Sequence, residues 1–346
     1  MKVKRVRTGD LRPGMLVAND IYAINGTLLA LKDSIVNERM IALLQRAYIQ
    51  AINIRQTDLL DDTEGFATRK FTETFDRIHN DIKDTFEKVV VDKEVNTKEI
   101  VEELESLMVE AGNSYDLLNM LLDMRKISGG IYYHAIQVAM ISRVLGGWLD
   151  MPKEDVALLE VAGLFHDIGK CRIDPKILNK KESLSRSEYE TVRQHAIEGY
   201  KIVRDKNLDG RIKQAVLSHH ERCDGSGYPL GVKANKIGAF PRVVAIADVY
   251  AAMLEKRPYR KRSYSPFEIV GYLEQDCVGK FDAEYLMSFL SRILDAYLHR
   301  QVKLDNGIVG EVIFINKSNP SKPLLKILGG YLDLSLTPEI SIVEVL

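Results

Sequence analysis

Five of the seven histidines in this 346-residue chain are concentrated between residues 134 and 220. They are His134, His166, His195, His219 and His220. The apolar residues around them recur at helical spacing, as in the stripe from His134 to Leu145. A single histidine on such a stripe is more often a hydrogen-bonded core residue than a metal ligand. The concentration of histidines, rather than any one of them, therefore constrains the fold and its chemistry.

The pair His166–Asp167 follows the apolar run ALLEVAGLF. A buried imidazole beside a buried carboxylate is costly unless each group is paired or binds a metal. Neighbouring side chains on a regular helix point about 100° apart, so both can face one site only where the helix ends and turns. The Ile-Gly-Lys that follows predicts a helix end at this pair.

A second adjacent pair, His219–His220, follows the amphipathic run IKQAVLS and precedes Glu221. Imidazole nitrogens and carboxylate oxygens are good ligands for first-row transition metals. Five histidines and two aspartates are about enough ligands for two ions, with room left for water and substrate. Paired metal ions are a known arrangement for hydrolysing phosphoryl esters.

The ordered motifs resemble the HD-GYP family of the HD superfamily across residues 125–300. The resemblance is carried by His134, HDIGK with His166 and Asp167, RQHAIEGY with His195, HHERCDGSGYP with His219 and His220, AIADVY with Asp248, and RPYR. It implies a bacterial signalling hydrolase, a metal-dependent phosphodiesterase that converts cyclic di-GMP to pGpG and/or GMP. The attacking group would be a hydroxide held between two divalent transition-metal ions, iron or manganese.

The resemblance also implies which residues hold each ion. His134, His166, Asp167 and Asp248 would surround one ion, and Asp167, His195, His219 and His220 would serve the other. Asp167 would bridge the two. Family members with three metals carry an extra Glu four residues before the first ligand histidine. Since Gly130 stands there in this chain, two metals are expected.

Basic residues near these motifs are the expected phosphate contacts. Lys170, three residues after Asp167, would place a cation at the scissile phosphate and, with Asp167, take part in catalysis. Arg257 and Arg260 of RPYR would hold phosphate oxygens through charge-assisted hydrogen bonds. Taken alone, KRPYRKR is more typical of a solvated basic loop.

The GSGYP segment is the other expected substrate contact, through Gly227 and Tyr228. Gly225 and Gly227 permit backbone angles closed to other residues, and Pro229 fixes the exit of the loop. The loop either shapes a substrate pocket or offers a docking surface to protein partners. The sequence leaves both alternatives open.

One departure from the family pattern bears on turnover. Members usually carry a second Asp three residues after the ligand Asp, whereas this chain has Ala251 after Asp248. The ligands are intact, so metal binding should survive while activity could be weak. A second hypothesis is therefore a low-turnover cyclic di-GMP receptor or protein-interaction scaffold that keeps the metal site. A third, hydrolysis of another nucleotide, is disfavoured by the HHERCDGSGYP block.

The two ends of the chain predict β structure. In residues 1–60, IYA and TLLAL flank Asn25–Gly26, a strong hairpin signal, a helical pattern follows from Asn37, and AINI reads as a strand. These features predict a small N-terminal α/β domain. In residues 301–346, Asn306–Gly307 and Gly329–Gly330 separate short β-branched or Leu-rich runs. They predict a short C-terminal β appendage.

Helical patterning fills the middle of the chain. Residues 61–112 predict linking amphipathic helices, the second of which Asn96 and Thr97 can cap. By the resemblance of their motifs, residues 113–300 would form the HD-GYP phosphodiesterase domain. The helices between 66 and 125 are compatible with a homodimer seam or with an outer layer of the core, and a core layer is the commoner arrangement. The expected fold class is mainly α: an all-helical HD-domain core with an α/β domain before it and β strands after it.

Composition limits the partners. Lys and Arg total 48 against 49 Asp and Glu, a net charge of -1 that gives no general field for a nucleic-acid polymer. An anionic substrate therefore needs a local cationic cluster. No apolar run is long enough for a signal peptide or a membrane span, so no membrane association is expected. Three cysteines are too few for a disulfide framework and fit a cytoplasmic protein.

Overall fold

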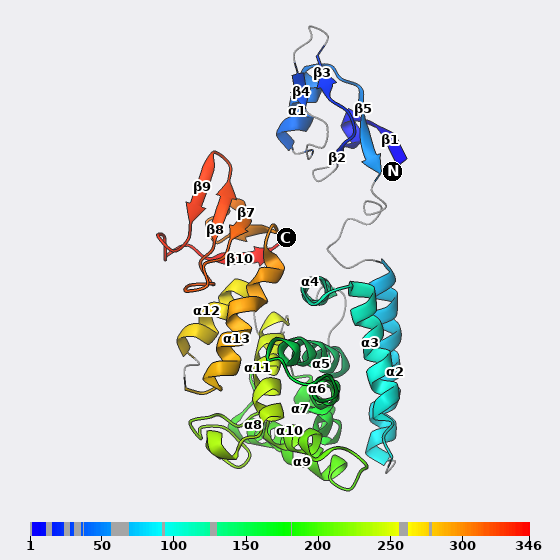
Figure 1. Ribbon diagram of the computed structural model, residues 1–346, viewed down its shortest axis with the longest axis vertical. Coiled ribbons are helices and arrows are strands. Elements are labelled where there is room, and N and C mark those ends of the chain that lie inside the picture. The colour runs from blue at the N-terminus through cyan, green and yellow to red at the C-terminus, as the bar shows by residue number, and fades with distance from the viewer. Residues whose placement is uncertain are drawn as a thin grey trace. The chain divides into compact units, whose positions relative to one another are not determined.

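The computed structural model describes residues 2–11, 16–23, 28–30, 36, 38–56, 69–91, 94–124, 130–180, 182–255, 262–276 and 279–346. The chain divides into two compact units, residues 1–64 and 65–346. Helices account for most of the second unit, so the expected mainly α fold is confirmed (Figure 1). No helix among the described residues has both the length and the apolar character to cross a membrane.

The first unit is a small α/β fold. Its three-stranded antiparallel sheet has the order β1 (Lys2–Arg7), β5 (Ala51–Gln56), β2 (Leu16–Val17). A second strand pair, β3 (Ile21–Tyr22) with β4 (Leu28–Ala30), is the expected hairpin, although Asn25–Gly26 lies outside the described residues. Helix α1 (Glu38–Arg46) contributes Leu44 to a core shared with Ile52 and Ile54.

The second unit is a helical bundle followed by a sheet. Its helices are α2 (Arg69–Val91), α3 (Thr97–Ala111), α4 (Ser114–Met124), α5 (Ile131–Trp148), α6 (Lys153–Phe165), α7 (Pro175–Leu178), α8 (Arg186–Arg193), α9 (His195–Val203), α10 (Gly210–Ser218), α11 (Ala239–Leu254), α12 (Pro266–Asp276) and α13 (Ala283–Ile293). Short 3-10 helices include η2 (Ile168–Arg172) and η4 (Leu294–Tyr297). Helix α5 is the central element, because it is buried along nearly its whole length and packs against α6 and α11.

Helices α2 and α3 lie side by side along one flank of this bundle (Figure 1). The apolar stripe of α2, from Phe71 to Val89, is buried within the unit and joins its core. The interpretation of these helices as an outer core layer is thereby confirmed. Asn96 caps α3 as expected, since its side chain accepts a hydrogen bond from the backbone N–H of Glu99.

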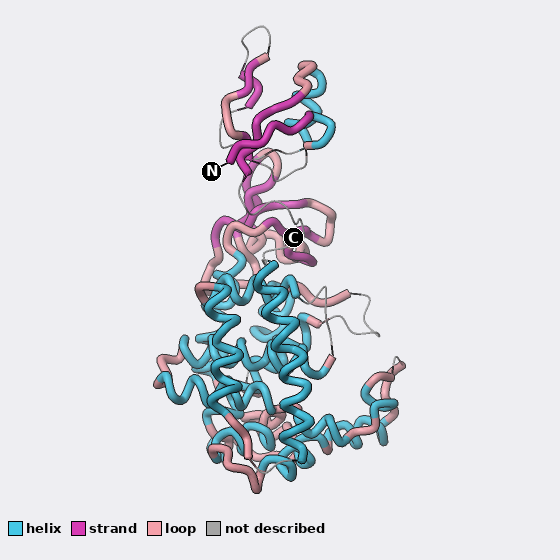
Figure 2. Tube along the Cα trace, turned by 90° about the vertical axis from the view of Figure 1, so that its right-hand side faces the viewer, coloured by secondary structure: helices cyan, strands magenta, loops and turns pink. Residues whose placement is uncertain are grey.

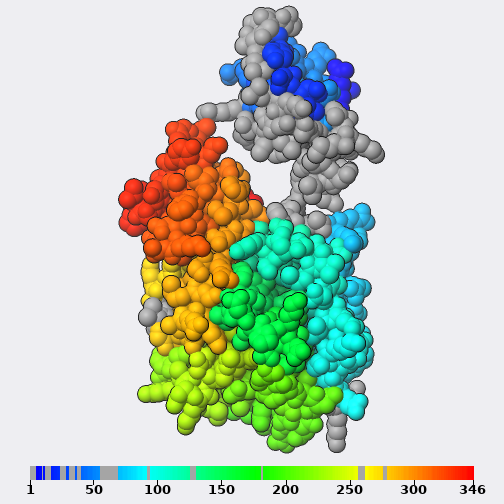
Figure 3. All heavy atoms as spheres, viewed as in Figure 1, coloured from blue at the N-terminus to red at the C-terminus, as the bar shows by residue number. Residues whose placement is uncertain are grey.

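The C-terminal strands form a five-stranded antiparallel sheet at one end of the bundle (Figure 2). Its order is β10 (Ile342–Val345), β6 (Gln301–Leu304), β7 (Val309–Phe314), β8 (Leu324–Ile327), β9 (Gly330–Asp333). Val302, Val312 and Leu325 point inward and belong to the same hydrophobic core as the helices. In the space-filling view the sheet abuts α12 and α13 (Figure 3). The expected β appendage is therefore a layer of this unit's core.

Two glycines bring η2 against α9, and this contact places the helix ends that carry the histidines. A Cβ on Gly169 would lie 1.9 Å from the carbonyl oxygen of His195 and 2.4 Å from the backbone nitrogen of Gly199. Both neighbours are backbone atoms, which cannot move aside as a flexible side chain can. Only glycine fits at position 169 without separating the two elements.

We expect Gly169→Ala to destabilise the protein by about 1–3 kcal/mol or more, because the added methyl group overpacks a backbone contact. Thermal unfolding should show a lower midpoint, and metal content should fall as the elements separate. Gly147→Ala is the matched control, since it lies in α5 with nothing within 4 Å of the added Cβ. Equal unfolding midpoints for the two variants would contradict the close approach.

A buried carboxylate on α6 gives the second unit a pH-dependent stability. Glu160 is fully buried and accepts a hydrogen bond of 2.8 Å from Arg143 on α5, while its other oxygen has no hydrogen-bond partner among the described residues. Burial raises the pKa of Glu160 from 4.5 to about 7, although Arg143 lowers it. Between these two pH values the folded state holds more protons than the unfolded state, so stability falls as pH rises.

Glu160→Gln should therefore gain stability over wild type as pH rises through about 5 to 7, by on the order of 1–3 kcal/mol. Urea unfolding of both proteins at pH 5 and pH 8 measures this gain. Glu105→Gln removes a half-exposed carboxylate that also pairs with Arg143, and it should show no such gain. A pH-independent difference for Glu160→Gln would count against a raised pKa.

Candidate metal centre

The candidate ligands come mostly from places where helices begin or end. His166 and His219 cap the C-termini of α6 and α10, and His195 opens α9. The chain leaves α6 at His166, and Asp167 then precedes η2 with φ -100° and ψ 10°. This turn confirms the helix end predicted at the His166–Asp167 pair. Two further candidates, His134 and Asp248, project from within α5 and α11.

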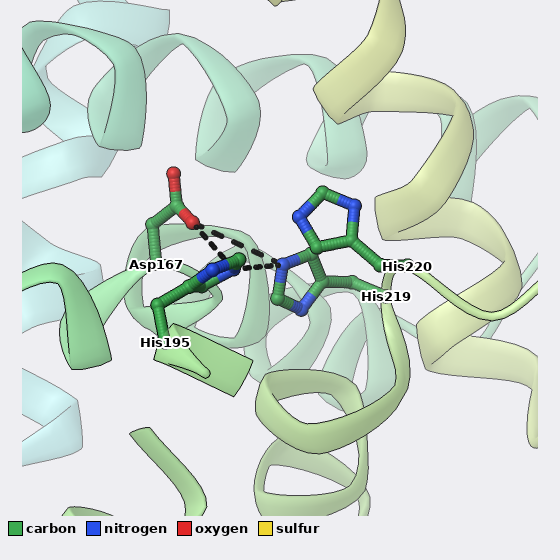
Figure 4. Close-up of side chains that lie close together, drawn as sticks. All are labelled: Asp167, His195, His219 and His220. Carbon is green, nitrogen blue, oxygen red and sulfur yellow. Dashed lines mark hydrogen bonds and ion pairs between the residues drawn. The ribbon is translucent and has the colours of Figure 1, made fainter. Parts of the chain in front are cut away.

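All seven candidates are brought together in the interior of the second unit. His166 and His219 are fully buried, and His220 is the most exposed of the seven, with 17% of its side chain accessible. They form two adjoining groups whose ligand atoms lie within 4.8 Å of one another in each group. One group is His134, His166 and Asp248; the other is Asp167, His195, His219 and His220, shown in Figure 4.

Asp167 lies between the two groups and turns one oxygen to each. Its Oδ2 is 3.2 Å from His166 Nε2 and 3.8 Å from His134 Nε2. Its Oδ1 is 3.2 Å from His195 Nε2 and 3.9 Å from His219 Nε2 (Figure 4). A carboxylate placed in this way can bind two cations at once, one through each oxygen.

Three of the imidazoles are oriented by main-chain carbonyls. His166 Nδ1 lies 2.7 Å from the carbonyl oxygen of Gly163, and His195 Nδ1 lies 2.7 Å from that of Val192. His219 Nδ1 lies 3.1 Å from the carbonyl oxygen of Ala215. Because a carbonyl only accepts hydrogen bonds, each Nδ1 carries the proton and donates it. When such a ring is neutral, its lone pair is on Nε2, which faces the centre.

The charge states of the second group suit cation binding. Burial lowers the pKa of His219 to about 3, and the neighbouring His166 and His195 reinforce this shift. Burial likewise lowers the pKa of His195 and, with the help of His219, that of His220. These rings are neutral near pH 7 and have nitrogen lone pairs to donate.

The two carboxylates are ionised. Burial would raise the pKa of Asp167, but Lys170 and His166 hold it well below its ordinary value. Burial would also raise the pKa of Asp248, but the hydrogen bond from His134 and the charge of that ring hold it well below its ordinary value. For His134, burial lowers the pKa, yet Glu255 and Asp248 raise it to about 9. Lys170 and His134, which is protonated near pH 7, are thus the cations that balance these two carboxylates.

Two buried polar atoms of the centre have no hydrogen-bond partner among the described residues, and a bound metal ion would give them one. Among the described residues, His166 Nε2 and Asp167 Oδ1 are buried with no hydrogen-bond partner. His195 Nε2 and His219 Nε2 face each other at 3.3 Å, although each Nδ1 carries its ring's proton. Two lone pairs at this distance repel unless a cation or proton lies between them. The nitrogen and oxygen donor set therefore fits divalent transition metals.

The expected substrate contacts lie beside this centre as far as the structure describes them. Lys170 forms a close ion pair with Asp167 and remains partly exposed. The ring of Tyr228 stacks on that of His220, with centroids 4.5 Å apart, and the guanidinium of Arg193 covers it at 4.5 Å. Arg257 and Arg260 lie outside the described residues.

Gly227 is a glycine because of the space that it leaves, and not because of its backbone angle. The prediction that it needs an unusual backbone angle is wrong, since only Gly225 of the two has a positive φ, +84°. A Cβ on Gly227 would lie 2.4 Å from the backbone nitrogen of Arg222 and 2.5 Å from the carbonyl oxygen of His220. Gly227 is required because the loop folds back tightly onto the end of the His219–His220 segment.

Sequence reasoning missed two carboxylates that organise the centre. Glu221 accepts hydrogen bonds from the backbone N–H groups of Leu230, Gly231 and Val232, at 2.6 to 3.2 Å, and so holds the GSGYP loop. Glu255 lies 2.9 Å from Nδ1 of His134. Its position seven residues after Asp248, two helical turns along the same face, was the available sequence signal.

A known protein family matches the part of the chain that carries these candidate ligands. A family model described as "HD domain" matches residues 98–285, more than half of the chain. This match confirms the family resemblance inferred from the histidine motifs.

Several named proteins match part of this chain. The cyclic di-GMP phosphodiesterase PA4108 of Pseudomonas aeruginosa is 29% identical over 219 residues, 63% of this chain and 52% of that protein. The cyclic di-GMP phosphodiesterase of Thermotoga maritima is 34% identical over 172 residues, 48% of this chain and 45% of that protein. The 3'3'-cGAMP-specific phosphodiesterase 1 of Vibrio cholerae is 32% identical over 154 residues, 44% of this chain and 36% of that protein. The chain thus spans about half or less of the length of these relatives.

Because Asp167 faces both groups, Asp167→Asn should lower the metal content more than Asp248→Asn does. The amide nitrogen cannot coordinate a cation, so one of the two contacts is lost and the charge that attracts both ions disappears. Metal analysis of protein reconstituted with manganese measures the effect. Asp205→Asn, a change at an exposed surface carboxylate, is the control and should retain wild-type metal. Wild-type metal content in folded Asp167→Asn would rule out a bridging role.

Proposed function

Because this chain belongs to the HD domain family, we propose that it is a metal-dependent phosphodiesterase that hydrolyses cyclic di-GMP. The observation that carries the proposal is the placement of the ionised carboxylate of Asp167 between two groups of buried candidate ligands. The similarity to phosphodiesterases of cyclic dinucleotides supports the substrate class. Cleavage of one phosphodiester bond gives linear pGpG, and cleavage of the second gives GMP.

The proposed cofactor is a pair of divalent transition-metal ions, iron or manganese. His134, His166 and Asp248 would hold one ion, His195, His219 and His220 the other, and Asp167 both. Bound cations supply the chemistry of the reaction by activating water and neutralising charge on the phosphate. Gly130, the N-cap of α5, supplies no carboxylate four residues before His134 and so favours two ions over three.

The protein's own residues would bind and orient the substrate. Lys170 is partly exposed beside Asp167, where its ammonium group can meet a phosphate oxygen. Tyr228, stacked between His220 and Arg193, offers a rigid aromatic wall next to the centre. On the RPYR motif alone, we include Arg257 and Arg260 as phosphate ligands. The substrate's charge is thus met locally, as the net charge of -1 requires.

A second candidate function is a metal-containing cyclic di-GMP receptor or interaction scaffold with low turnover. The specific observation in its favour is Ala251, which is fully buried on α11 where family members carry a second Asp. The GSGYP loop would then be the surface for protein partners, since Leu230 at its end is 61% exposed. Homodimerisation is a further property to be measured in the same preparation.

Hydrolysis assays on anaerobically purified protein loaded with iron or manganese test the proposal. Cyclic di-GMP should be converted to pGpG or GMP, and 3'3'-cGAMP and a deoxynucleoside triphosphate should be poorer substrates. Lys170→Met should lower kcat/KM by about 100-fold or more, because a charge at the phosphate is lost. Lys201→Met, a change at an exposed surface lysine on α9, is the control. Bound but unaltered cyclic di-GMP after hours would favour the receptor.

A further inference from the structure

The Nδ1 atom of His134 faces a side-chain carboxylate, that of Glu255, whereas three other candidate ligands direct Nδ1 to a main-chain carbonyl. Glu255 Oε1 lies 2.9 Å from His134 Nδ1, while the opposite ring nitrogen, Nε2, lies 3.0 Å from Asp248 Oδ1. The His134 side chain is 6% exposed and that of Glu255 is 17% exposed. One imidazole is thus held between two carboxylates in a nearly water-free site.

At three other histidines the orienting group is a main-chain carbonyl, which no substitution removes. His166, His195 and His219 each direct Nδ1 to a carbonyl oxygen three or four residues earlier in the chain. His134 is the fourth residue of α5, and its ring is oriented by a carboxylate from another part of the chain. Among the described candidate ligands, His134 therefore depends on a side chain for its orientation.

Helix α11 explains how both carboxylates reach the same ring. Asp248 and Glu255 are seven residues apart, so they project about 20° apart after two helical turns. Asp248 meets the edge of the imidazole that carries Nε2, and Glu255 meets the edge that carries Nδ1. Glu255 also caps the end of α11, with its backbone N–H bonded to the carbonyl of Ala251. Its backbone position is therefore fixed by the helix.

We propose that Glu255 is a positioning residue for the metal group formed by His134, His166 and Asp248. Its carboxylate accepts the Nδ1 proton of His134, so that a cation which replaced the Nε2 proton would meet the lone pair of that nitrogen. A carboxylate in this relation to a ligand histidine fixes the tautomer and raises the basicity of the ring. The inference rests on the proposed function only in that this group holds a metal ion.

Manganese titration of the metal-free protein, followed by the electron paramagnetic resonance of free Mn²⁺, tests the role without any substrate. Wild type should bind two ions, and Glu255→Ala should weaken one of them by about 10- to 100-fold while leaving the other unchanged. Glu255→Gln keeps an oxygen that accepts the Nδ1 proton, so its loss should be smaller than that of Glu255→Ala. Glu284→Ala, an exposed glutamate in the first turn of α13, should bind as wild type does.

A spectroscopic measurement separates positioning from a general loss of structure. In zinc-loaded protein with ¹⁵N-labelled histidine, the His134 ring of wild type should show the Nδ1–H tautomer with a coordinated Nε2. Glu255→Ala should lose this signature at His134 while His195 and His219 keep theirs. Unchanged tautomer and unchanged manganese affinity in Glu255→Ala would overturn the proposal, as would failure of wild type to bind two ions.

The two proposals fail separately. If Glu255→Ala loses one manganese ion but wild type leaves cyclic di-GMP intact, the positioning role stands and the phosphodiesterase does not. If wild type hydrolyses cyclic di-GMP and Glu255→Ala matches it in metal affinity, tautomer and rate, the phosphodiesterase stands and the positioning role is wrong. Should Glu255→Ala not fold, Glu255→Gln with the same two measurements decides, since it keeps the size and shape of the side chain.

Discussion

The pairing of the buried carboxylate of Asp167 with Lys170 and the imidazoles around it is the interaction on which the rest of the second unit depends. Removing its charge from water is expensive, and the surrounding residues offset that cost from several directions. Lys170 pairs with it from η2, and imidazoles approach its two oxygens from opposite sides. Each of these partners must be delivered by a different helix. The bundle therefore brings the ends of α6, α9 and α10, the 3-10 helix η2 and one face of α5 to this carboxylate.

Helix termini suit this task because the chain changes direction there. A regular helix would point His166 and Asp167 apart, whereas the turn after α6 allows both to face the centre. The carbonyl groups of a last helical turn are also free to orient a ring, as Gly163 does for His166. The close approach of Gly169 to α9 then sets how near His195 lies to the pair. The backbone conformation at these helix ends therefore also determines where the candidate ligands lie.

Much of this arrangement could be predicted from the sequence. The rest could not, because it depends on contacts that form only when the chain folds. The mainly α fold, the hairpin near the N-terminus and the helix end at His166 follow from local patterns, which neighbouring residues determine. Glu255 escaped because its importance depends on packing between α5 and α11, whose contacts are distant in sequence. Gly227 was misjudged because a missing side chain can serve either backbone angle or space, and only the structure distinguishes them.

The GSGYP loop is attached to the candidate metal centre through Glu221 and His220. Glu221 follows the two histidines directly and accepts three backbone N–H groups from residues 230–232, so the loop is tied to the end of α10. Tyr228 is thereby held against His220, and its hydroxyl keeps its proton because burial raises the pKa of Tyr228 far above its ordinary value. The ring of His220 in turn faces Asp248, with its Nδ1 3.7 Å from Asp248 Oδ2. The GSGYP loop and the candidate metal ligands are therefore in contact through one imidazole, that of His220.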